Sequence, residues 1–247
     1  MGEPLMRMLV TRPEPGAQST LARLDALGIE AIAAPVMVRQ TLEASLPQPE
    51  GFTAMVLTSA NAVRALVDRG VAGDYHHLPV FAVGDRTALE ATEAGFLRVS
   101  SAAGAFQDLV NAMTIARVPG PIFYPTGKHQ SADLAKALAP SGVMVATAKV
   151  YEMVAVDALP ETVLAGLTDG SLGAVLAYSR RTAEIFAALT QALQAPQRRR
   201  LAMLCMSEAV AEPLLEARFN RISLADRPDE DAMMALALAF AREQTGP

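Results

Sequence analysis

The sequence has one cysteine, no tryptophan and only 5% aromatic residues among its 247 positions. A lone Cys205 cannot form an intramolecular disulfide. The three histidines, His76, His77 and His129, have no cysteine or carboxylate at metal-ligand spacing, so we expect no metal site. With so few aromatic rings to stack on a flavin, the composition also argues against a flavodoxin-like cofactor protein, although it leaves that alternative open.

Positive charge and long apolar runs are also scarce. The chain has 21 Lys and Arg against 26 Asp and Glu, a net charge of −5, which disfavours nucleic-acid binding. Apolar runs such as Ala235 to Ala241 fall well short of the roughly 20 residues that cross a bilayer. Residues Met1 to Pro4 lack the basic start of a signal peptide. We therefore expect a cytoplasmic protein with no membrane span.

Short β-rich runs alternate with Ala- and Leu-rich amphipathic stretches along most of the chain, which is typical of a parallel α/β fold. Helical patterns are clearest over residues 18–27, 60–69, 87–94, 107–116, 131–139, 181–193 and 229–241. The ten predicted strands, enough for two five-stranded sheets, are residues 8–11, 29–38, 54–58, 80–84, 97–100, 121–125, 143–151, 173–178, 201–206 and 221–224.

The order of these elements repeats, which indicates an internal duplication. The predicted helix 18–27, Gly28 and the strand that follows resemble the predicted helix 131–139, Gly142 and the strand that follows. The two glycines are offset by 142 − 28 = 114 residues. The strand and loop that lead to Ser59 resemble those that lead to Ser179, an offset of 179 − 59 = 120 residues. We interpret the chain as two related α/β domains.

The pattern alone allows each half-domain to close with its neighbour or with its distant copy. Segments 40–52 and 152–170 follow equivalent strands and lack the full helix that a parallel crossover needs, so they are better interpreted as paired linkers. This predicts a discontinuous domain of residues 1–37 and 155–247, a second domain of residues 42–150, and linkers at 38–41 and 151–154.

Ligands of open α/β sheets bind at the carboxyl ends of the strands, where helix N-termini attract anions. The candidate loops there are 11–13, 58–61, 84–87, 125–128, 178–181 and 206–208. Ser59, Thr87 and Ser207 can equally be plain helix caps. Gly84 stands outside any dinucleotide fingerprint, and Gly127-Lys128 lacks the remaining residues of a phosphate loop.

Five segments in order resemble the uroporphyrinogen-III synthase family over essentially the full chain. They are Leu9-Val-Thr-Arg-Pro13, Leu57-Thr-Ser-Ala-Asn-Ala62, Ala82-Val-Gly-Asp-Arg-Thr-Ala88, Tyr124-Pro-Thr-Gly127 and Lys149-Val-Tyr151. The resemblance implies two flavodoxin-like domains joined by a two-stranded linker. It also implies that the enzyme cyclises hydroxymethylbilane, with loss of water and inversion of the terminal ring, and uses no cofactor.

The resemblance implies Tyr151 as the catalytic residue. It implies substrate binding by residues on the candidate loops: Arg12, Ser59, Gly84, Thr87, Lys128, Ser179 and Ser207. The chain departs from the family at Ser207 and Val210, where the second half usually repeats the Gly and Thr seen at Gly84 and Thr87. A non-catalytic binding protein for an acidic, tetrapyrrole-like molecule therefore remains an alternative. We expect a monomer that can receive its substrate from the upstream deaminase.

Overall fold

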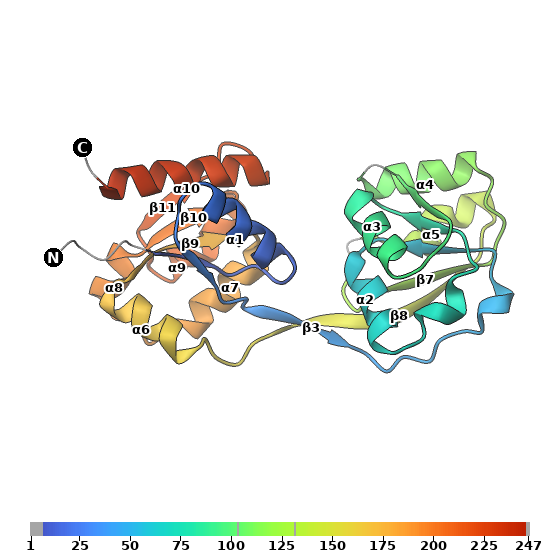
Figure 1. The fold of residues 1–247 in the computed structure, drawn as a ribbon, viewed down its shortest axis with the longest axis horizontal. Helices are drawn as coiled ribbons and strands as arrows, with labels where there is room; N and C mark the ends of the chain where they lie inside the picture. The colour runs from blue at the N-terminus through green and yellow to red at the C-terminus, as the bar shows by residue number, and fades with distance from the viewer. Residues whose placement is uncertain (1–6, 103, 131, 246–247) are drawn as a thin grey trace. The chain divides into compact units, whose positions relative to one another are not determined.

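The protein is described by a computed structural model that covers residues 7–102, 104–130 and 132–245. It divides into two compact units. The first unit takes the chain up to Val38 together with the chain from Val154, and the second runs from Arg39 to Met153. Figure 1 shows the first unit combining blue elements from the start of the chain with yellow-to-red elements from its end. Two distant stretches of sequence therefore fold together.

The first unit contains a five-stranded parallel sheet in the order β11-β10-β9-β1-β2. Its strands are β1 (Arg7–Val10), β2 (Ala31–Ala33), β9 (Leu172–Ala177), β10 (Ala202–Cys205) and β11 (Arg221–Leu224). Its helices are α1 (Gly16–Ala26), α6 (Glu161–Asp169), α7 (Arg180–Leu189), α8 (Ala195–Arg200), α9 (Glu208–Glu216) and α10 (Glu230–Thr245).

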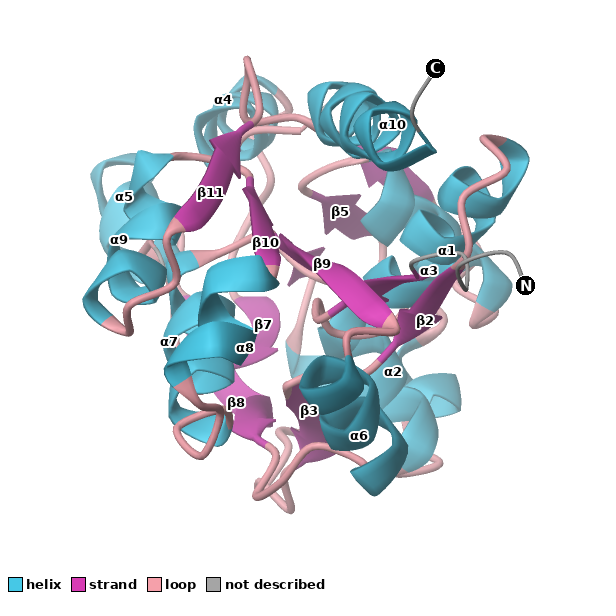
Figure 2. Cartoon of the chain, turned by 90° about the vertical axis from the view of Figure 1, so that its left-hand side faces the viewer, coloured by secondary structure: helices cyan, strands magenta, loops and turns pink. Residues whose placement is uncertain are grey.

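Alternating side chains of this sheet fill two apolar layers, as the two-residue period of a strand requires. Met8 and Val10 face α1 and α10, where they pack with Leu24, Met233 and other buried side chains. Figure 2 shows α1 and α10 on one side of the sheet and α6 to α9 on the other. The sheet is therefore covered on both faces, as expected for parallel strands.

The second unit contains a six-stranded sheet in the order β3-β8-β7-β4-β5-β6. Its strands are β3 (Met37–Thr41), β4 (Ala54–Leu57), β5 (Val80–Ala82), β6 (Val99–Ser101), β7 (Ile122–Gly127) and β8 (Val145–Ala155). Its helices are α2 (Ala60–Asp68), α3 (Asp85–Glu93), α4 (Phe106–Ile115) and α5 (Leu134–Leu138), with 3-10 turns at Pro49–Gly51, Ala72–Tyr75 and Ala139–Ser141.

This second sheet also has apolar layers on both faces. Met55 and Phe123 pack toward the side that carries Leu66 of α2. Their strand neighbours Val56 and Ile122 pack toward α4 and α5. The described part of the chain thus forms two parallel-dominated sheets, and the two units together contain ten α-helices. None of the described helices combines the length and apolar character needed to cross a membrane.

The structure corrects several sequence predictions. The single strand predicted over residues 29–38 is split at Pro35, which has no N–H to donate, and its end forms β3, the sixth strand of the second sheet. The segment 152–170, interpreted as a linker with only a short helical face around Val163–Leu167, contains the nine-residue helix α6. The helix predicted over 131–139 shortens to α5, and its first residue, Ser131, lies outside the described residues.

Candidate functional site

The carboxyl ends of parallel strands share one edge of their sheet, so the topology places most predicted site residues along two such edges. Ser59 follows β4, Gly84 and Thr87 follow β5, and Lys128 follows β7, all in the second unit. The first-unit edge carries the other three, which follow the adjacent strands β1, β9 and β10: Arg12, Ser179 and Ser207.

Tyr151 lies within β8 rather than at its end, and it pairs with Gly127, the last residue of β7. The register shifts by one residue just before this pair, which is the mark of a β-bulge. The Tyr151 ring covers Gly127 so closely that a Cβ there would lie 2.9 Å from Cζ and 3.0 Å from the hydroxyl oxygen. The ring also packs on the core that contains Phe123.

The Tyr151 hydroxyl makes no hydrogen bond within the described ranges of the chain. Its side chain is only partly buried. A phenol that is held by its ring and has an uncommitted hydroxyl can donate to a ligand without losing a bond inside the protein. This geometry is compatible with the catalytic role that the resemblance implies for Tyr151.

Ser59 and Gly84 begin the helices α2 and α3. The Ser59 hydroxyl oxygen accepts a hydrogen bond from the Asn61 N–H at 3.2 Å, so it caps α2. Gly84 has an extended backbone and lies against Gly104, whose Cα would be 3.3 Å from an added Cβ. The buried Thr87 donates its N–H to the Gly84 carbonyl oxygen at 3.0 Å. The helix-cap interpretation therefore holds for Ser59, which can still donate through its O–H.

Lys128 is not the free cation that its loop position suggests. Its Nζ lies 2.7 Å from the Glu152 carboxylate, and its N–H donates to the Tyr151 carbonyl oxygen at 2.8 Å. Arg180 is likewise paired, with Glu184 at 3.0 Å and with Glu212. By contrast, Arg86 is exposed and forms no ion pair with any described residue. Internal carboxylates thus pair with both Lys128 and Arg180.

In the first unit, Ser179 and Ser207 precede the helices α7 and α9, but their hydroxyl groups differ in their hydrogen bonds. The Ser179 hydroxyl oxygen accepts from the Thr182 N–H at 3.3 Å and contacts the Thr182 hydroxyl at 2.9 Å. Ser207 begins α9 without a side-chain cap bond. Val210, at the position where the resemblance implies a threonine, is buried in the core. The Ser207 hydroxyl is therefore the less committed of the two.

Arg12 lies at the centre of a polar cluster that joins distant parts of the first unit. Its Nη1 donates to Glu230 Oε2 at 2.5 Å and to the Thr20 hydroxyl at 3.2 Å. Its guanidinium stands over the Tyr178 ring, 4.2 Å from the ring centre. The Tyr178 hydroxyl and the Thr20 hydroxyl each donate to Glu230 Oε1 at 3.0 Å. The loop after β1, the loop after β9 and the start of α10 are thereby tied together.

Burial raises the pKa of Tyr178 to about 12, with the nearby negative charge of Glu230 adding to the effect and the Thr20 hydrogen bond opposing it. The phenol therefore stays protonated at neutral pH and remains a donor to Glu230. Sequence reasoning placed Tyr178 on a candidate loop without a role and missed Glu230 and Thr20. Only the position of Tyr178 directly before Ser179 pointed to it.

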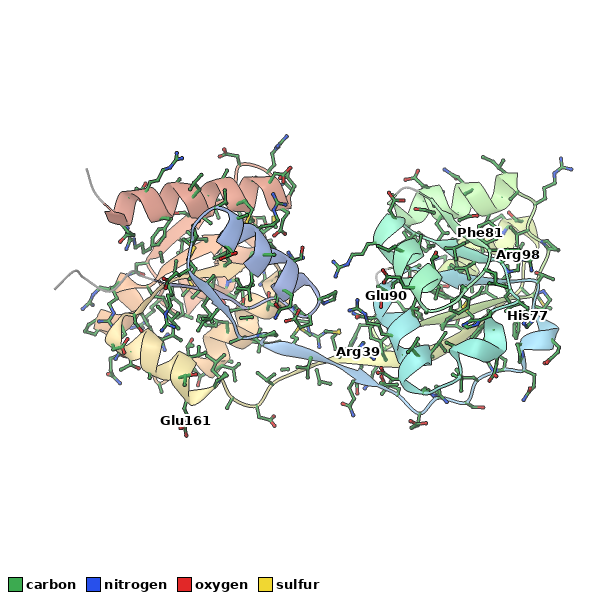
Figure 3. The ribbon with its side chains drawn as sticks, viewed as in Figure 1. Arg39, His77, Phe81, Glu90, Arg98 and Glu161 are labelled. Atoms are coloured by element: carbon green, nitrogen blue, oxygen red, sulfur yellow. The ribbon has the colours of Figure 1, made fainter. Side chains whose placement is uncertain are left out.

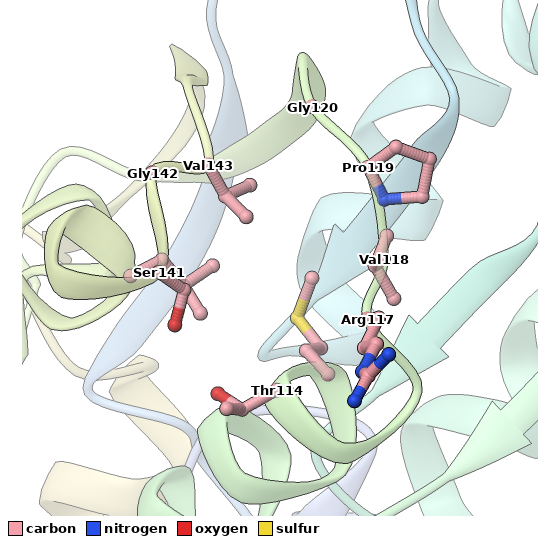
Figure 4. Close-up of a pocket in the computed structure, with 10 residues that line it drawn as sticks. Thr114, Arg117, Val118, Pro119, Gly120, Ser141, Gly142 and Val143 are labelled. Carbon is pink, nitrogen blue, oxygen red and sulfur yellow. The ribbon is translucent and has the colours of Figure 1, made fainter.

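One hollow in the described structure lies away from both carboxyl edges. It measures about 310 Å³ and lies at the amino ends of β7 and β8, between the end of α4 and the turn at Ala139–Ser141. Figure 4 shows Thr114, Arg117 and Ser141 on its walls. None of the predicted site residues lines this hollow.

The His, Cys, Asp and Glu side chains were compared with the requirements of a metal site and of a reactive thiol. No cluster of three or more His, Cys, Asp or Glu suited to a metal ion occurs in residues 7–102, 104–130 and 132–245. Cys205 is buried in β10, and burial raises the pKa of its thiol to about 12. The thiol therefore stays protonated and unreactive at neutral pH.

Comparison with known proteins identifies the family. The family model described as uroporphyrinogen-III synthase HemD matches residues 18–235. A uroporphyrinogen-III synthetase structure from Helicobacter pylori is similar at 18% identity and a TM-score of 0.61, over 95% of this chain and 100% of that chain.

A mutant uroporphyrinogen III synthase from Thermus thermophilus is similar at 18% identity and a TM-score of 0.47, over 97% of this chain and 100% of that one. A search of curated proteins gives no match. The structural likeness to the Helicobacter pylori protein supports the fold, whereas the family model covers most of the chain. The chain belongs to the uroporphyrinogen-III synthase family.

Proposed function

We propose that this protein cyclises hydroxymethylbilane to uroporphyrinogen III, with loss of the terminal hydroxyl as water and inversion of the last ring. The observation that carries the proposal is the family match over residues 18–235. Membership in the family also favours an enzyme over the non-catalytic binding protein, which no observation on this chain supports.

Tyr151 is proposed as the catalytic residue. Its hydroxyl is uncommitted within the described chain, and its ring is fixed against Gly127 and the core. Donation of a hydrogen bond to the departing hydroxyl oxygen would stabilise the charge that develops as the C–O bond breaks. The phenol keeps its own proton, and the departing hydroxyl becomes water with the proton that the substrate loses as the new C–C bond forms.

Substrate binding is proposed to rely on the carboxyl edges of both sheets. The substrate carries eight carboxylates, and each exposed helix N-terminus can contribute about 0.3–1 kcal/mol toward one anion. Ser59 and Gly84 begin such helices in the second unit, where Thr87 lies in the first turn of α3, and Ser179 and Ser207 begin them in the first. Among the side chains, Arg12 and Lys128 are the proposed cations. Lys128 must exchange Glu152 for a substrate carboxylate.

An internal duplication is proposed for the two sheets. The first-unit sheet follows the order β2-β1-β9-β10-β11, and the second follows β8-β7-β4-β5-β6 when β3 is set aside. These orders correspond strand for strand, β2-β1 with β8-β7 and β9-β10-β11 with β4-β5-β6. Numbered along the chain, the first sheet has the flavodoxin-like order 2-1-3-4-5, and the second has its circular permutation, 5-4-1-2-3. We propose that β3 and the end of β8 form the two-stranded connection and that hinge motion there closes the enzyme on its substrate.

The enzyme is further proposed to be a cytoplasmic monomer that needs no cofactor and receives its unstable substrate from the upstream deaminase. The test couples the purified protein to that deaminase and separates the type I and type III products. Predominant type III product supports the synthase. Type I product alone, the outcome of spontaneous closure, would overturn it.

A further inference from the structure

The guanidinium of Arg12 uses only one of its three nitrogens in contacts within the described chain. Nη1 binds Glu230 and Thr20, whereas Nε and Nη2 have no hydrogen-bond partner among the described residues. An arginine has five N–H groups in a rigid plane, and two of them can bind a carboxylate side by side. The unused edge of Arg12 therefore has the capacity to hold a second carboxylate.

Three neighbours fix the plane of this guanidinium. Tyr178 supports it from one side at 4.2 Å, and Glu230 anchors Nη1 at 2.5 Å. Glu230 is itself held by the Tyr178 hydroxyl at 3.0 Å. Gly16, the first residue of α1, leaves room for the guanidinium, because a Cβ there would lie 2.6 Å from Nε and 3.1 Å from Nη2.

The cluster is not sealed from solvent. The side chains of Arg12 and Glu230 remain 24% and 26% exposed. Arg12 is therefore partly exposed at the carboxyl edge of β1, the place where ligands of such sheets bind, with the start of α1 beside its Nε and Nη2.

We propose that Gly16, Tyr178 and Glu230 are positioning residues that hold Arg12 so that its unused edge takes one carboxylate of the substrate. The inference rests on the proposed function, because the ligand class is the polycarboxylate substrate. A side chain that is already fixed loses less conformational freedom on binding, so the carboxylate is bound more tightly than by a mobile arginine. The carboxylate of Glu230 orients the Arg12 guanidinium through Nη1, and the Tyr178 ring supports one face of the guanidinium.

Gly16→Ala tests this most sharply, because it displaces the guanidinium without removing any charge. The backbone at Gly16 is not left-handed, so alanine fits the helix, and the end of the Arg12 side chain must move instead. We expect KM for hydroxymethylbilane to rise about tenfold with kcat changed less than about twofold, which matches the loss of one charged hydrogen bond. Gly73→Ala is the matched control, because a Cβ there meets no atom within 4 Å.

A double-mutant cycle shows whether the effect runs through Arg12. Arg12→Met should raise KM at least as much, and Gly16→Ala should then add nothing in the Arg12→Met background. Glu230→Gln should also raise KM, whereas Asp231→Asn, which breaks the neighbouring pair with Arg23, should not. An unchanged KM in Gly16→Ala, or an equal effect with and without Arg12, would overturn the proposal.

The readouts separate this inference from the proposed function. If the wild-type protein forms no type III product, the proposed function fails. Binding of uroporphyrin III, a stable macrocycle with the same eight carboxylates, then replaces KM in the same cycle. If the wild type is active and Gly16→Ala lowers only thermal stability, the function stands, and the cluster is a structural tie alone.

Discussion

The ring of Tyr151 lies directly on Gly127, the residue that it pairs with across β7 and β8. The contact leaves no room for a side chain on Gly127, since a Cβ would come within 2.9 Å of the ring. The bulge in β8 just before this pair sets the direction in which the phenol projects. The position of the proposed catalytic hydroxyl thus depends on the absence of one methyl group.

Gly127→Ala should therefore displace the Tyr151 ring and lower kcat. We expect a fall of about tenfold or more, because a displacement of about 1 Å at a reacting group can cost up to a hundredfold. The measurement is steady-state turnover of hydroxymethylbilane. Combined with Tyr151→Phe, the alanine should cause little further loss. A fully additive loss would show that Gly127 acts by another route.

Tyr151→Phe removes the hydroxyl and keeps the ring contacts. We expect kcat to fall about 10–100-fold, the range for loss of a hydrogen bond to a charged group. Because the hydroxyl makes no hydrogen bond inside the described chain, the free energy of unfolding should change by less than about 0.5 kcal/mol. Turnover equal to wild type would remove Tyr151 from the mechanism.

Ser59 and Ser207 form a matched pair of helix-starting serines. Ser59→Ala should lower the free energy of unfolding by about 1 kcal/mol, because it removes the cap on α2. Ser207→Ala should have a smaller effect on stability, because that side chain makes no cap bond. The Ser207 change should instead raise KM, since its hydroxyl is uncommitted. Urea denaturation and steady-state kinetics on both variants give the comparison, and equal stability losses would contradict it.

Asp68 links α2 to β3 through Arg39, which is labelled in Figure 3. Hydrogen bonds from Arg39 and Thr41 hold the pKa of Asp68 below its usual value of 3.8. A carboxyl whose pKa is lower in the folded state stabilises the fold above its unfolded pKa, and this contribution is lost as the pH falls through the folded pKa.

Wild type should therefore be more stable than Asp68→Asn at neutral pH, and the difference should shrink once the pH drops below about 4. Urea unfolding of both proteins from pH 7 to pH 3 measures it. A difference that stays constant over this range would show that the Asp68 charge does not contribute.

The sequence pattern predicts the strands well, because buried parallel strands are short apolar runs whose ends are marked by glycine, proline or a hydroxyl residue. It fails where one residue overrides the pattern. Pro35 separates β2 from β3 inside one apolar run, and Pro213 lies within α9, where proline normally interrupts a helix. The helix α6 was obscured because only Val163 and Leu167 mark its apolar face.

The ion pairs of the candidate site could not be predicted from the sequence. Arg12 and Glu230 are 218 positions apart, and no local spacing joins them. Lys128 directly follows β7 and Glu152 lies in β8, so their pairing depends on the β7–β8 register. Position at the end of a strand can be predicted from a pattern, whereas the partner of a side chain requires the tertiary fold.

The central claim is that this chain directs ring closure to the inverted isomer. The most direct measurement is the fraction of type III product formed from freshly generated hydroxymethylbilane as the protein concentration is raised against the competing spontaneous reaction. We predict that the type III fraction climbs toward one and that Tyr151→Phe requires far more protein to reach the same fraction. Type I product at every concentration of the folded wild-type protein would contradict the account.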